Sequence, residues 1–464
     1  MKNMTLERIA AVCNGIYIGN EADKQKKIAG VVIDSRLVEP GDLFVPIRGE
    51  RVDGHTFIPA VFEKGAAAVL SEEELADPAG PYILVPSCQT ALKTLAAYYR
   101  STLSIPVVGI TGSVGKTSTK EMIASVLGQK YSVLKTAGNY NNEIGLPLTI
   151  FKIKETHEAA VLEMGISEFG EMHRLAEMAK PDICVITNIG LCHLENLKSR
   201  DGILKAKTES FEHLNKGGIA VLNGDDDKLS GISSVNGTAP VFYGIGKEKK
   251  EGCATEKDVY ATDIQSMGLS GTKVTIHMGE ESFEAVIPIP GEHNVYNALA
   301  AACVGRRLGL TNAEIKAGIE SAGTISGRTN MLHVKDMLVI DDCYNANPIS
   351  MKASIDVLSH ADGRKIAVLG DMGELGTNEK ELHYGVGEYL ATKNIDVLFT
   401  AGTLAEEIAR GVQENGGTCE VHTFADREKM TEKLAAFVKA GDTILVKASH
   451  FMQFPKVVEA LTRE

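Results

Sequence analysis

The sequence contains no tryptophan and no pair of cysteines spaced as in common zinc-binding motifs. Its eight cysteines include no CxxC pair, and Cys184, Cys303 and Cys343 each lie inside an apolar run. Cysteines of this kind are expected to be reduced and mostly buried, as in cytoplasmic proteins. The cysteine pattern therefore predicts a cytoplasmic protein, and a zinc site is not expected.

Long hydrophobic runs and an excess of positive charge are also missing. No segment approaches the roughly 20 apolar residues of a membrane-spanning helix, and the opening stretch MKNMTLERIAAVCNG is too charged for a signal peptide. The formal net charge of -13 argues against a general nucleic-acid or membrane-surface binder, since either would need a basic face. Local basic loops remain able to hold an anionic substrate.

The chain is long enough, at 464 residues, for about three domains of ordinary size. Residues 1–100 are predicted to form a mixed α/β domain that includes strands at Val31–Ile33 and Leu43–Ile47. Residues 101–320 alternate strands and helices, which predicts a mostly parallel, doubly wound sheet. Residues 321–464 alternate again and are expected to form a smaller, Rossmann-like α/β domain.

The most informative stretch is PVVGITGSVGKTSTKEMIASVLG, residues 106–128. Its apolar start, its glycines and its helical spacing predict a strand, a glycine loop and a helix, which together aim backbone N–H groups at a phosphate. Lys116 would add a charge for the outer phosphates, and the Thr117 hydroxyl could ligate Mg²⁺. Ile110 occupies the place of the first glycine in the strict GxxxxGK[ST] pattern, yet the context favours nucleotide binding over an ordinary glycine turn.

Polar residues follow the predicted strands of the central domain, where ligands of such sheets gather. Glu163 ends the strand Ala159–Glu163 and is a natural Mg²⁺ ligand beside phosphates, although it could instead cap a neighbouring helix. His193 follows the strand Ile183–Thr187 and, taken alone, is more often a structural histidine. Lys207 lies two residues after Lys205 on a predicted helix, where two lysines usually form a solvated face.

Other candidate positions have equally plain alternatives. The Asn-rich loop around Asn141 and Asn142 suits hydrogen bonding, but such turns are common without function. A pair such as Ser35-Arg36 at a strand end could bind a diphosphate or form a local salt bridge. An Ala-rich helix begins near Asn294, and asparagine is a good capping residue there.

Nine motifs taken together carry a family resemblance. In chain order they are TGSVGKTS, NYNNEIGLPLT, LEMGISEFGE, NIGLCHLENLKS, KAKTE, GEHNVYNALAA, SGRTNML, DDCYNANP and GDMGELG. Spread over residues 111–376, they closely resemble the Mur ligases, the ATP-dependent amide-forming enzymes of peptidoglycan precursor synthesis. Within the family, NYNNEIG, DDCYNANP and GDMGELG are most similar to members that add D-alanyl-D-alanine to UDP-N-acetylmuramoyl-tripeptide.

The resemblance implies a reaction in which ATP phosphorylates the substrate carboxylate and the incoming amine then displaces phosphate. It also implies a set of ATP-phosphate contacts, two Mg²⁺ ions and a carbamylated Lys207, for which Lys205 is the nearest competitor. The phosphate contacts would be Thr111, Gly112, Ser113, Val114, Gly115, Lys116 and Thr117. The Mg²⁺ ligands would be Thr117 and Glu163 for one ion, with His193 and carbamylated Lys207 for the other.

The resemblance further implies that the third domain completes the site by closing. Asn294 and Asn297 match the adenine side, and Arg328 and Asp342 would reach ATP from the third domain, with Lys116, Lys207, His193 and Arg328 as the catalytic set. Candidate contacts to the UDP-sugar, the peptide and the dipeptide are Ser35, Arg36, Asp53, His55, Asn141, Asn142, Tyr344, Asn345 and Asn347. Near the end, VKASHFMQF departs from the usual Gly-Ser-Arg run, having Ala448 and His450 in place of Gly and Arg.

Four alternatives stay open at the level of sequence. The chain could be a Mur ligase that adds the third residue, although DDCYNANP argues against this. It could also be an enzyme similar to folylpolyglutamate synthetase, although such enzymes lack a first domain like the one predicted here. A non-catalytic nucleotide-binding regulator is disfavoured by the complete residue set, and a plain NTP hydrolase by the two further α/β units. The chain is expected to act as a monomer.

Overall fold

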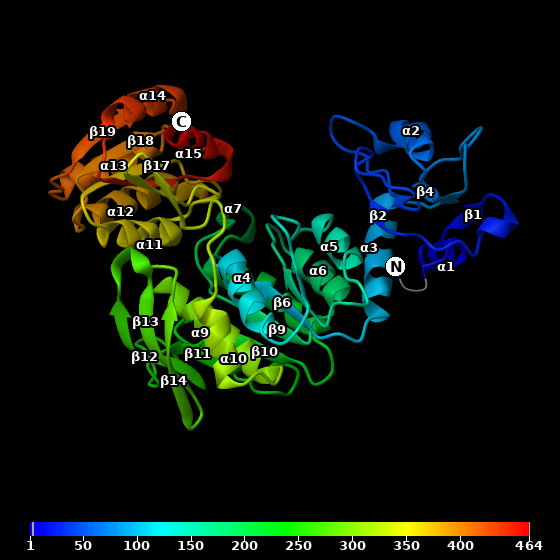
Figure 1. Cartoon of the computed structure of the whole chain (residues 1–464), viewed down its shortest axis with the longest axis horizontal. Coiled ribbons are helices and arrows are strands. Elements are labelled where there is room, and N and C mark those ends of the chain that lie inside the picture. Colours follow the sequence, from blue (N-terminus) through cyan, green and yellow to red (C-terminus); the bar gives the residue numbers. More distant parts are fainter. Residues whose placement is uncertain (2–3, 464) are drawn as a thin grey trace.

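The computed structural model, which describes residue 1 and residues 4–463, contains three β-sheets that follow one another along the chain. Figure 1 shows the first and third domains at opposite sides of the central one. Each sheet lies within one of the three ranges expected from the sequence, while the exact domain boundaries stay a prediction. Within the described part of the chain, no helix has the length and apolar character needed to cross a membrane.

The N-terminal sheet has the strand order β1-β5-β4-β3-β2, with only β1 antiparallel to its neighbour. The expected strand Leu43–Ile47 ends at Phe44, because Pro46 has no N–H with which to continue the ladder. The elements are α1 (Leu6–Val12), β1 (Ile16–Ile18), η1 (Glu21–Asp23), β2 (Val31–Val32), β3 (Leu43–Phe44), η2 (Gly54–Phe57), α2 (Ile58–Glu63), β4 (Ala68–Ser71), β5 (Tyr82–Leu84) and α3 (Cys88–Ser101).

The central sheet has nine strands in the order β14-β13-β12-β11-β10-β9-β6-β8-β7, parallel from β7 to β12 and antiparallel at β13 and β14. Its strands are β6 (Val107–Thr111), β7 (Val133–Lys135), β8 (Ala159–Glu163), β9 (Ile183–Ile186), β10 (Ile219–Asn223), β11 (Val241–Ile245), β12 (Val259–Ser266), β13 (Thr272–Met278) and β14 (Glu281–Ile287). β6, β8 and β9 are buried along their whole length, as expected of strands covered on both faces.

Helices cover both faces of this sheet, and the doubly wound expectation is confirmed. One core joins the sheet to α4, α9 and α10, and a second joins its other face to α5, α6 and α8. The helices are α4 (Lys116–Leu127), α5 (Gly145–Phe151), α6 (Glu171–Ala179), α7 (Leu194–Leu197), α8 (Arg200–Thr208), η3 (Glu209–His213), η4 (Gly268–Ser270), α9 (His293–Arg307) and α10 (Asn312–Glu320).

The C-terminal sheet has the order β15-β16-β20-β17-β18-β19, parallel except for the hairpin β15–β16. One face packs against α11, α12 and α13 and the other against α14 and α15. The elements are β15 (Asn330–Val334), β16 (Met337–Asp341), α11 (Pro348–Ser359), β17 (Arg364–Gly370), η5 (Gly376–Asn378), α12 (Glu379–Ala391), β18 (Val397–Ala401), α13 (Ala405–Glu414), β19 (Glu420–Phe424), α14 (Arg427–Phe437), β20 (Asp442–Lys447), η6 (His450–Met452) and α15 (Pro455–Thr462).

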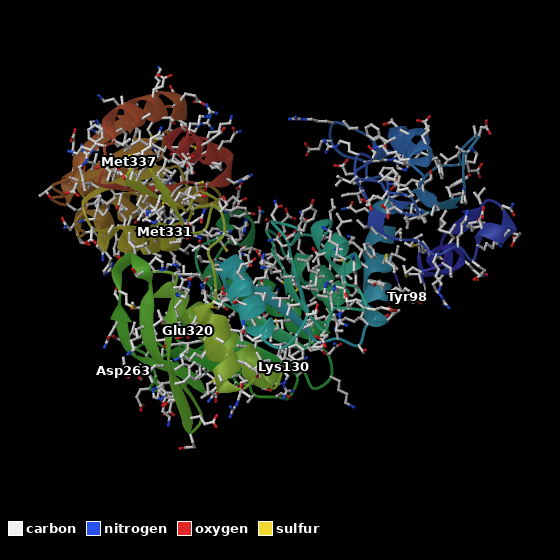
Figure 2. All side chains as sticks on the ribbon, in the orientation of Figure 1. Tyr98, Lys130, Asp263, Glu320, Met331 and Met337 are labelled. Carbon is white, nitrogen blue, oxygen red and sulfur yellow. The ribbon has the colours of Figure 1, made fainter. Side chains whose placement is uncertain are left out.

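Helix α3 joins the first domain to the second. Its residue Tyr98, labelled in Figure 2, lies at this junction, and its Tyr99 hydroxyl donates to the Ile153 carbonyl 2.6 Å away. Arg100 is 4% exposed, and its guanidinium donates to the carbonyls of Ala179 and Lys180, at 2.9 and 3.1 Å. These carbonyls lie at the end of α6, so the cation also satisfies helix-terminal acceptors that lack partners within the helix.

We expect Arg100→Ala to destabilise the junction, because the buried Ala179 carbonyl at the end of α6 would lose its donor. An unsatisfied buried polar group costs about 1–3 kcal/mol, so the midpoint of urea unfolding should fall measurably. Arg410→Ala, which removes an exposed arginine of α13, is the matched control and should change the midpoint little. Equal midpoints for the two variants would contradict this account of the junction.

Candidate active site

A glycine loop connects β6 to α4, as the sequence predicts. Gly112 packs so closely on Thr187 that a Cβ would collide with the threonine hydroxyl. Gly115 adopts φ 83° and precedes α4, whose first turn has no side-chain cap. Uncapped N–H groups at a helix start, together with the helix dipole, form an anion site. Lys116 turns its ammonium back onto the Gly112 carbonyl, 2.8 Å away.

Asn188, at the end of β9, holds this loop in shape. Its carboxamide accepts a hydrogen bond from the Val114 N–H and donates one to the Val114 carbonyl, both at 3.0 Å. The Thr187 hydroxyl donates to the same carbonyl at 2.6 Å. The sequence shows Asn188 as one of several polar residues at strand ends, but only the structure gives it this supporting role.

Glu163 lies at the end of β8, beside Thr117 of the adjacent helix. One carboxylate oxygen accepts hydrogen bonds from the Thr117 hydroxyl, at 3.2 Å, and from the Asn141 carboxamide, at 2.9 Å. The other oxygen is buried without a hydrogen-bond partner, and its nearest cation, the Lys120 ammonium, is 3.8 Å away. A buried anionic oxygen that lacks a partner is unfavourable unless a cation binds it, so this residue pair fits a Mg²⁺ ion.

Lys207 and Lys205 occupy opposite environments on α8. Lys207 is 1% exposed, and burial lowers the pKa of its ammonium to about 8. The ionisable groups that also act on it are Cys192 and Lys116, and no described carboxylate forms an ion pair with it. Lys205 is exposed and its ammonium lies over the Phe169 ring. It therefore belongs to the solvent-facing side of α8.

His193 adopts a left-handed backbone conformation, with φ 50°, just before α7. Its Nδ1 lies 2.6 Å from Glu374 Oε2 of the C-terminal domain, in an ion-pair contact without hydrogen-bond alignment. The imidazole lowers the pKa of Glu374, which itself has φ 61°. Non-glycine residues held in this region concentrate at functional sites. The sequence places Glu374 in the GDMGELG motif but does not pair it with His193.

Arg328 brings a second cation to the glycine loop from the C-terminal domain. Its guanidinium stacks on the Tyr344 ring at 4.2 Å, and one nitrogen lies 3.5 Å from the Thr117 hydroxyl. Its Nε is buried without a hydrogen-bond partner. Stacking orients the planar guanidinium, while its unpaired Nε–H remains available to an anion.

Lys447, which the sequence did not mark as a site residue, pairs with Asp342. Its ammonium is 2.7 Å from one Asp342 oxygen and 3.2 Å from the Asn345 carbonyl. The other Asp342 oxygen accepts a hydrogen bond from the Thr329 N–H. The pair orients the loop that follows β16 and carries Tyr344, Asn345 and Asn347.

A cavity of about 780 Å³ lies between the central and C-terminal domains. It brings together most of the expected residues of these domains, at the carboxyl ends of parallel strands. Those that line it are Ser113, Val114, Gly115, Lys116, Thr117, Asn141, Asn142, Glu163, His193, Asn297, Arg328, Asp342, Tyr344, Asn345 and Asn347.

Some expected residues lie behind or away from this cavity. Asn294 is 2% exposed and donates to the Pro290 carbonyl, while its own oxygen accepts from Asn297. Asn297 in turn accepts from Thr119 of α4. Thr111, Gly112, Asn294 and Lys207 are buried or loop-forming residues that do not line the cavity surface.

The four residues expected to bind the UDP-sugar lie in the N-terminal domain, outside the cavity. Arg36 is exposed and pairs with Asp34, whose pKa it lowers to about 2, and the Ser35 carbonyl accepts from Lys64. His55 is buried, with Nδ1 2.7 Å from Asp53 and Nε2 accepting from the Glu72 N–H. The structure therefore gives His55 a supporting role in its loop and leaves no free ring nitrogen.

Comparison with known proteins follows the same three-part division. Models of the Mur ligase family match residues 27–100 ("catalytic domain"), 110–305 ("middle domain") and 327–450 ("glutamate ligase domain"). The UDP-N-acetylmuramoyl-tripeptide--D-alanyl-D-alanine ligase of Bacillus subtilis is 38% identical over 99% of both chains. The chain belongs to the Mur ligase family.

Two solved structures of Mur ligases superpose over nearly the whole chain. A crystal structure of MurF from Acinetobacter baumannii has a TM-score of 0.89 at 30% identity, covering 99% of both chains. MurF ligase from Thermotoga maritima in complex with ADP has a TM-score of 0.80 at 34% identity, covering 93% of this chain and 97% of that one. The expected three-domain Mur ligase architecture is confirmed.

The C-terminal departure from the usual Mur ligase run has a clear structural setting. Ala448 is fully buried, whereas His450 is exposed and its ring centroid lies 5.9 Å from that of Tyr344. His450 thus stands beside a cavity residue without lining the cavity itself.

We expect Lys447→Met to destabilise the C-terminal domain, because it leaves the Asp342 carboxylate buried without its cation. Removing one partner of a buried ion pair costs about 3–5 kcal/mol. The matched control is Lys393→Met, since Lys393 also pairs with an aspartate, Asp356, at 2.7 Å but is more exposed. Hydrogen exchange of β16 and β20 should accelerate only in Lys447→Met. The same exchange rates in both variants would mean that the buried pair contributes little.

Proposed function

We propose that the chain joins D-alanyl-D-alanine to UDP-N-acetylmuramoyl-tripeptide with hydrolysis of ATP to ADP and phosphate, the last residue-adding step toward the peptidoglycan pentapeptide precursor. The reaction class and substrates come from relatives of that name that match along the full chain. The observation that supports it best is the cavity between the two domains. Lys116 lies in this cavity at the glycine loop, and Arg328 reaches the same loop from the C-terminal domain. We propose further that the enzyme acts as a monomer.

Bond changes in this reaction balance in two steps. The terminal carboxylate of the tripeptide attacks the γ-phosphorus of ATP, and the bond from that phosphorus to the bridging oxygen breaks, releasing ADP. The amine of D-alanyl-D-alanine then adds to the activated carbonyl carbon. Collapse of the tetrahedral intermediate breaks the carbon–oxygen bond to phosphate, and the amine nitrogen loses a proton.

The protein's contribution to these steps is positioning and charge neutralisation. Lys116 and the open N–H groups at the start of α4 would hold the phosphates, after the lysine leaves the Gly112 carbonyl. Arg328 would direct its unpaired Nε–H, and the Nη2 that lies near Thr117, at the transferred phosphoryl group. Because Arg328 belongs to the third domain, the charge around this group is complete only when the domains are closed.

The donor groups around the loop fit Mg²⁺. Thr117 and the unpartnered oxygen of Glu163 would hold one ion, and His193 with a carbamylated Lys207 would hold a second. The ions would supply positive charge to the phosphate oxygens. Lys207 suits carbamylation because its amine is buried and easily deprotonated, and a neutral amine adds to CO₂ with loss of a proton.

Substrate contacts are assigned by domain. Ser35, Arg36, Asp53 and the loop around His55 would meet the UDP-sugar in the N-terminal domain, although His55 itself has no free nitrogen. Asn297 and Asn294 would shape the adenine end of the cavity. The remaining peptide and dipeptide contacts would come from Asn141, Asn142, Tyr344, Asn345 and Asn347.

The direct test measures ADP and phosphate release with UDP-N-acetylmuramoyl-tripeptide, with and without D-alanyl-D-alanine. We expect release to depend on both substrates and to yield the pentapeptide by mass spectrometry, with no turnover in Lys116→Ala. Dependence on the UDP-dipeptide and a single amino acid would instead identify a third-residue ligase. Release that needs no acceptor would identify a hydrolase.

A second test separates the two lysines of α8. Lys207→Ala should lower turnover by at least about 100-fold, in line with the loss of an anionic metal ligand, and short carboxylic acids such as acetate should partly restore it. Lys205→Ala is the matched control and should retain activity, because Lys205 is solvated. Full activity of Lys207→Ala without added acid would exclude the carbamate.

A further inference from the structure

Three potential metal ligands converge on the central domain outside the candidate active site. His173 comes from α6, and Glu212 and His213 come from η3, and one ligand atom from each lies within 4.8 Å of the others. None of the three lines the cavity that holds the glycine loop. The cysteine pattern could not indicate this cluster, because none of its ligands is a thiolate.

The separations within the cluster suit a small cation with tetrahedral geometry. His213 Nε2 lies 3.3 Å from His173 Nδ1, and two nitrogens bound to one tetrahedral ion at 2.0–2.1 Å are themselves about 3.3 Å apart. Glu212 Oε2 lies 2.7 Å from the same His173 nitrogen, so it would move outward by roughly half an ångström. That movement is unhindered because the Glu212 side chain is 57% exposed.

The contacts of His173 also suit a cation. His173 Nδ1 faces both a carboxylate oxygen and a second imidazole nitrogen. A single ring nitrogen cannot form well-aligned hydrogen bonds to both groups, whereas one cation could bind all three atoms. The two rings meet edge to face, with centroids 4.5 Å apart.

A separate contact holds the two elements at this spacing before any ion binds. The Glu209 carboxylate, at the start of η3, accepts hydrogen bonds from the backbone N–H groups of Gly170 and His173 at the start of α6. Glu209 is not one of the three ligands, so the cluster rests on an independent scaffold. η3 follows α8 without a break, and α8 carries Lys207.

We propose that His173, Glu212 and His213 bind a divalent transition metal of the Zn²⁺ class. Imidazole nitrogens favour borderline ions such as Zn²⁺, Ni²⁺ and Co²⁺ over Mg²⁺ and Ca²⁺, which prefer oxygen ligands. Three protein ligands leave one tetrahedral position for water or another small ligand. The ion would fasten η3, and with it the end of α8, to α6, and this proposal is independent of the substrates of the ligase reaction.

The experiment is a Zn²⁺ titration by calorimetry on the full chain, first stripped of metal and kept in millimolar Mg²⁺, followed by the visible spectrum of the Co²⁺ form. We expect one Zn²⁺ per chain at this site and Co²⁺ bands typical of low coordination. His173→Ala and His213→Ala should each weaken that binding at least ten-fold. His422→Ala is the matched control and should leave Zn²⁺ binding unchanged. His422 also contacts a glutamate, Glu420, at 2.8 Å, but it is not part of the three-residue cluster.

The outcomes decide the proposal in either direction. Zn²⁺ binding that is unchanged in the His173→Ala/His213→Ala double variant would place the ion elsewhere, and an absence of Zn²⁺ binding would overturn the site altogether. Circular dichroism and the Mg²⁺-dependent ATP turnover of the variants without Zn²⁺ should match those of the parent chain. A failure of the ligase assay would leave the calorimetric result unaffected, so the two proposals can fail separately.

Discussion

The buried carboxylate of Glu163 imposes the constraint on which the candidate active site depends. Burying an anion is costly unless cations and hydrogen-bond donors surround it. Here Thr117 and Asn141 satisfy one oxygen, while the other stays buried without a hydrogen-bond partner. Because β8 is the direct neighbour of β6 in the sheet, this oxygen is held beside the glycine loop. A cation bound to a phosphate at that loop would also reach the oxygen.

The glycine loop is correspondingly rigid before any nucleotide binds. Gly112 has no room for a side chain against Thr187, and Asn188 holds the loop through two hydrogen bonds to Val114. Such preorganisation means that little reorganisation accompanies the binding of an anion. Lys116 is the group that would have to move, because its ammonium is turned back onto a carbonyl of the loop.

The third domain supplies what the central domain lacks. Arg328 reaches Thr117, and Glu374 reaches His193, so both contacts join the C-terminal domain to residues that line the cavity. Arg328 lies 3.5 Å from its partner, at the limit of a hydrogen bond, and the Glu374 side chain is largely exposed although it is 2.6 Å from His193. Long or solvent-exposed contacts of this type contribute little to stability, as the domain closure proposed above would require.

The sequence alone determined the alternation of strands and helices, the glycine loop and Glu163 at the end of β8. These features are local, because a strand, its following loop and the next helix lie within some twenty consecutive residues and follow periodic patterns. Proline chemistry explains why the strand expected at Leu43–Ile47 ends at Phe44, before Pro46. Family motifs extended the prediction to Arg328, His193 and Lys207.

Only the tertiary structure decided which groups meet. It distinguished Lys207 from Lys205, which differ by half a turn of α8 and hence by burial. It paired Lys447 with Asp342 and Glu374 with His193 across 105 and 181 residues of chain respectively. It also engaged both nitrogens of His55, one with nearby Asp53 and the other with the Glu72 N–H. Such pairings depend on how whole sheets and domains pack. The periodic pattern of a short segment therefore cannot predict them.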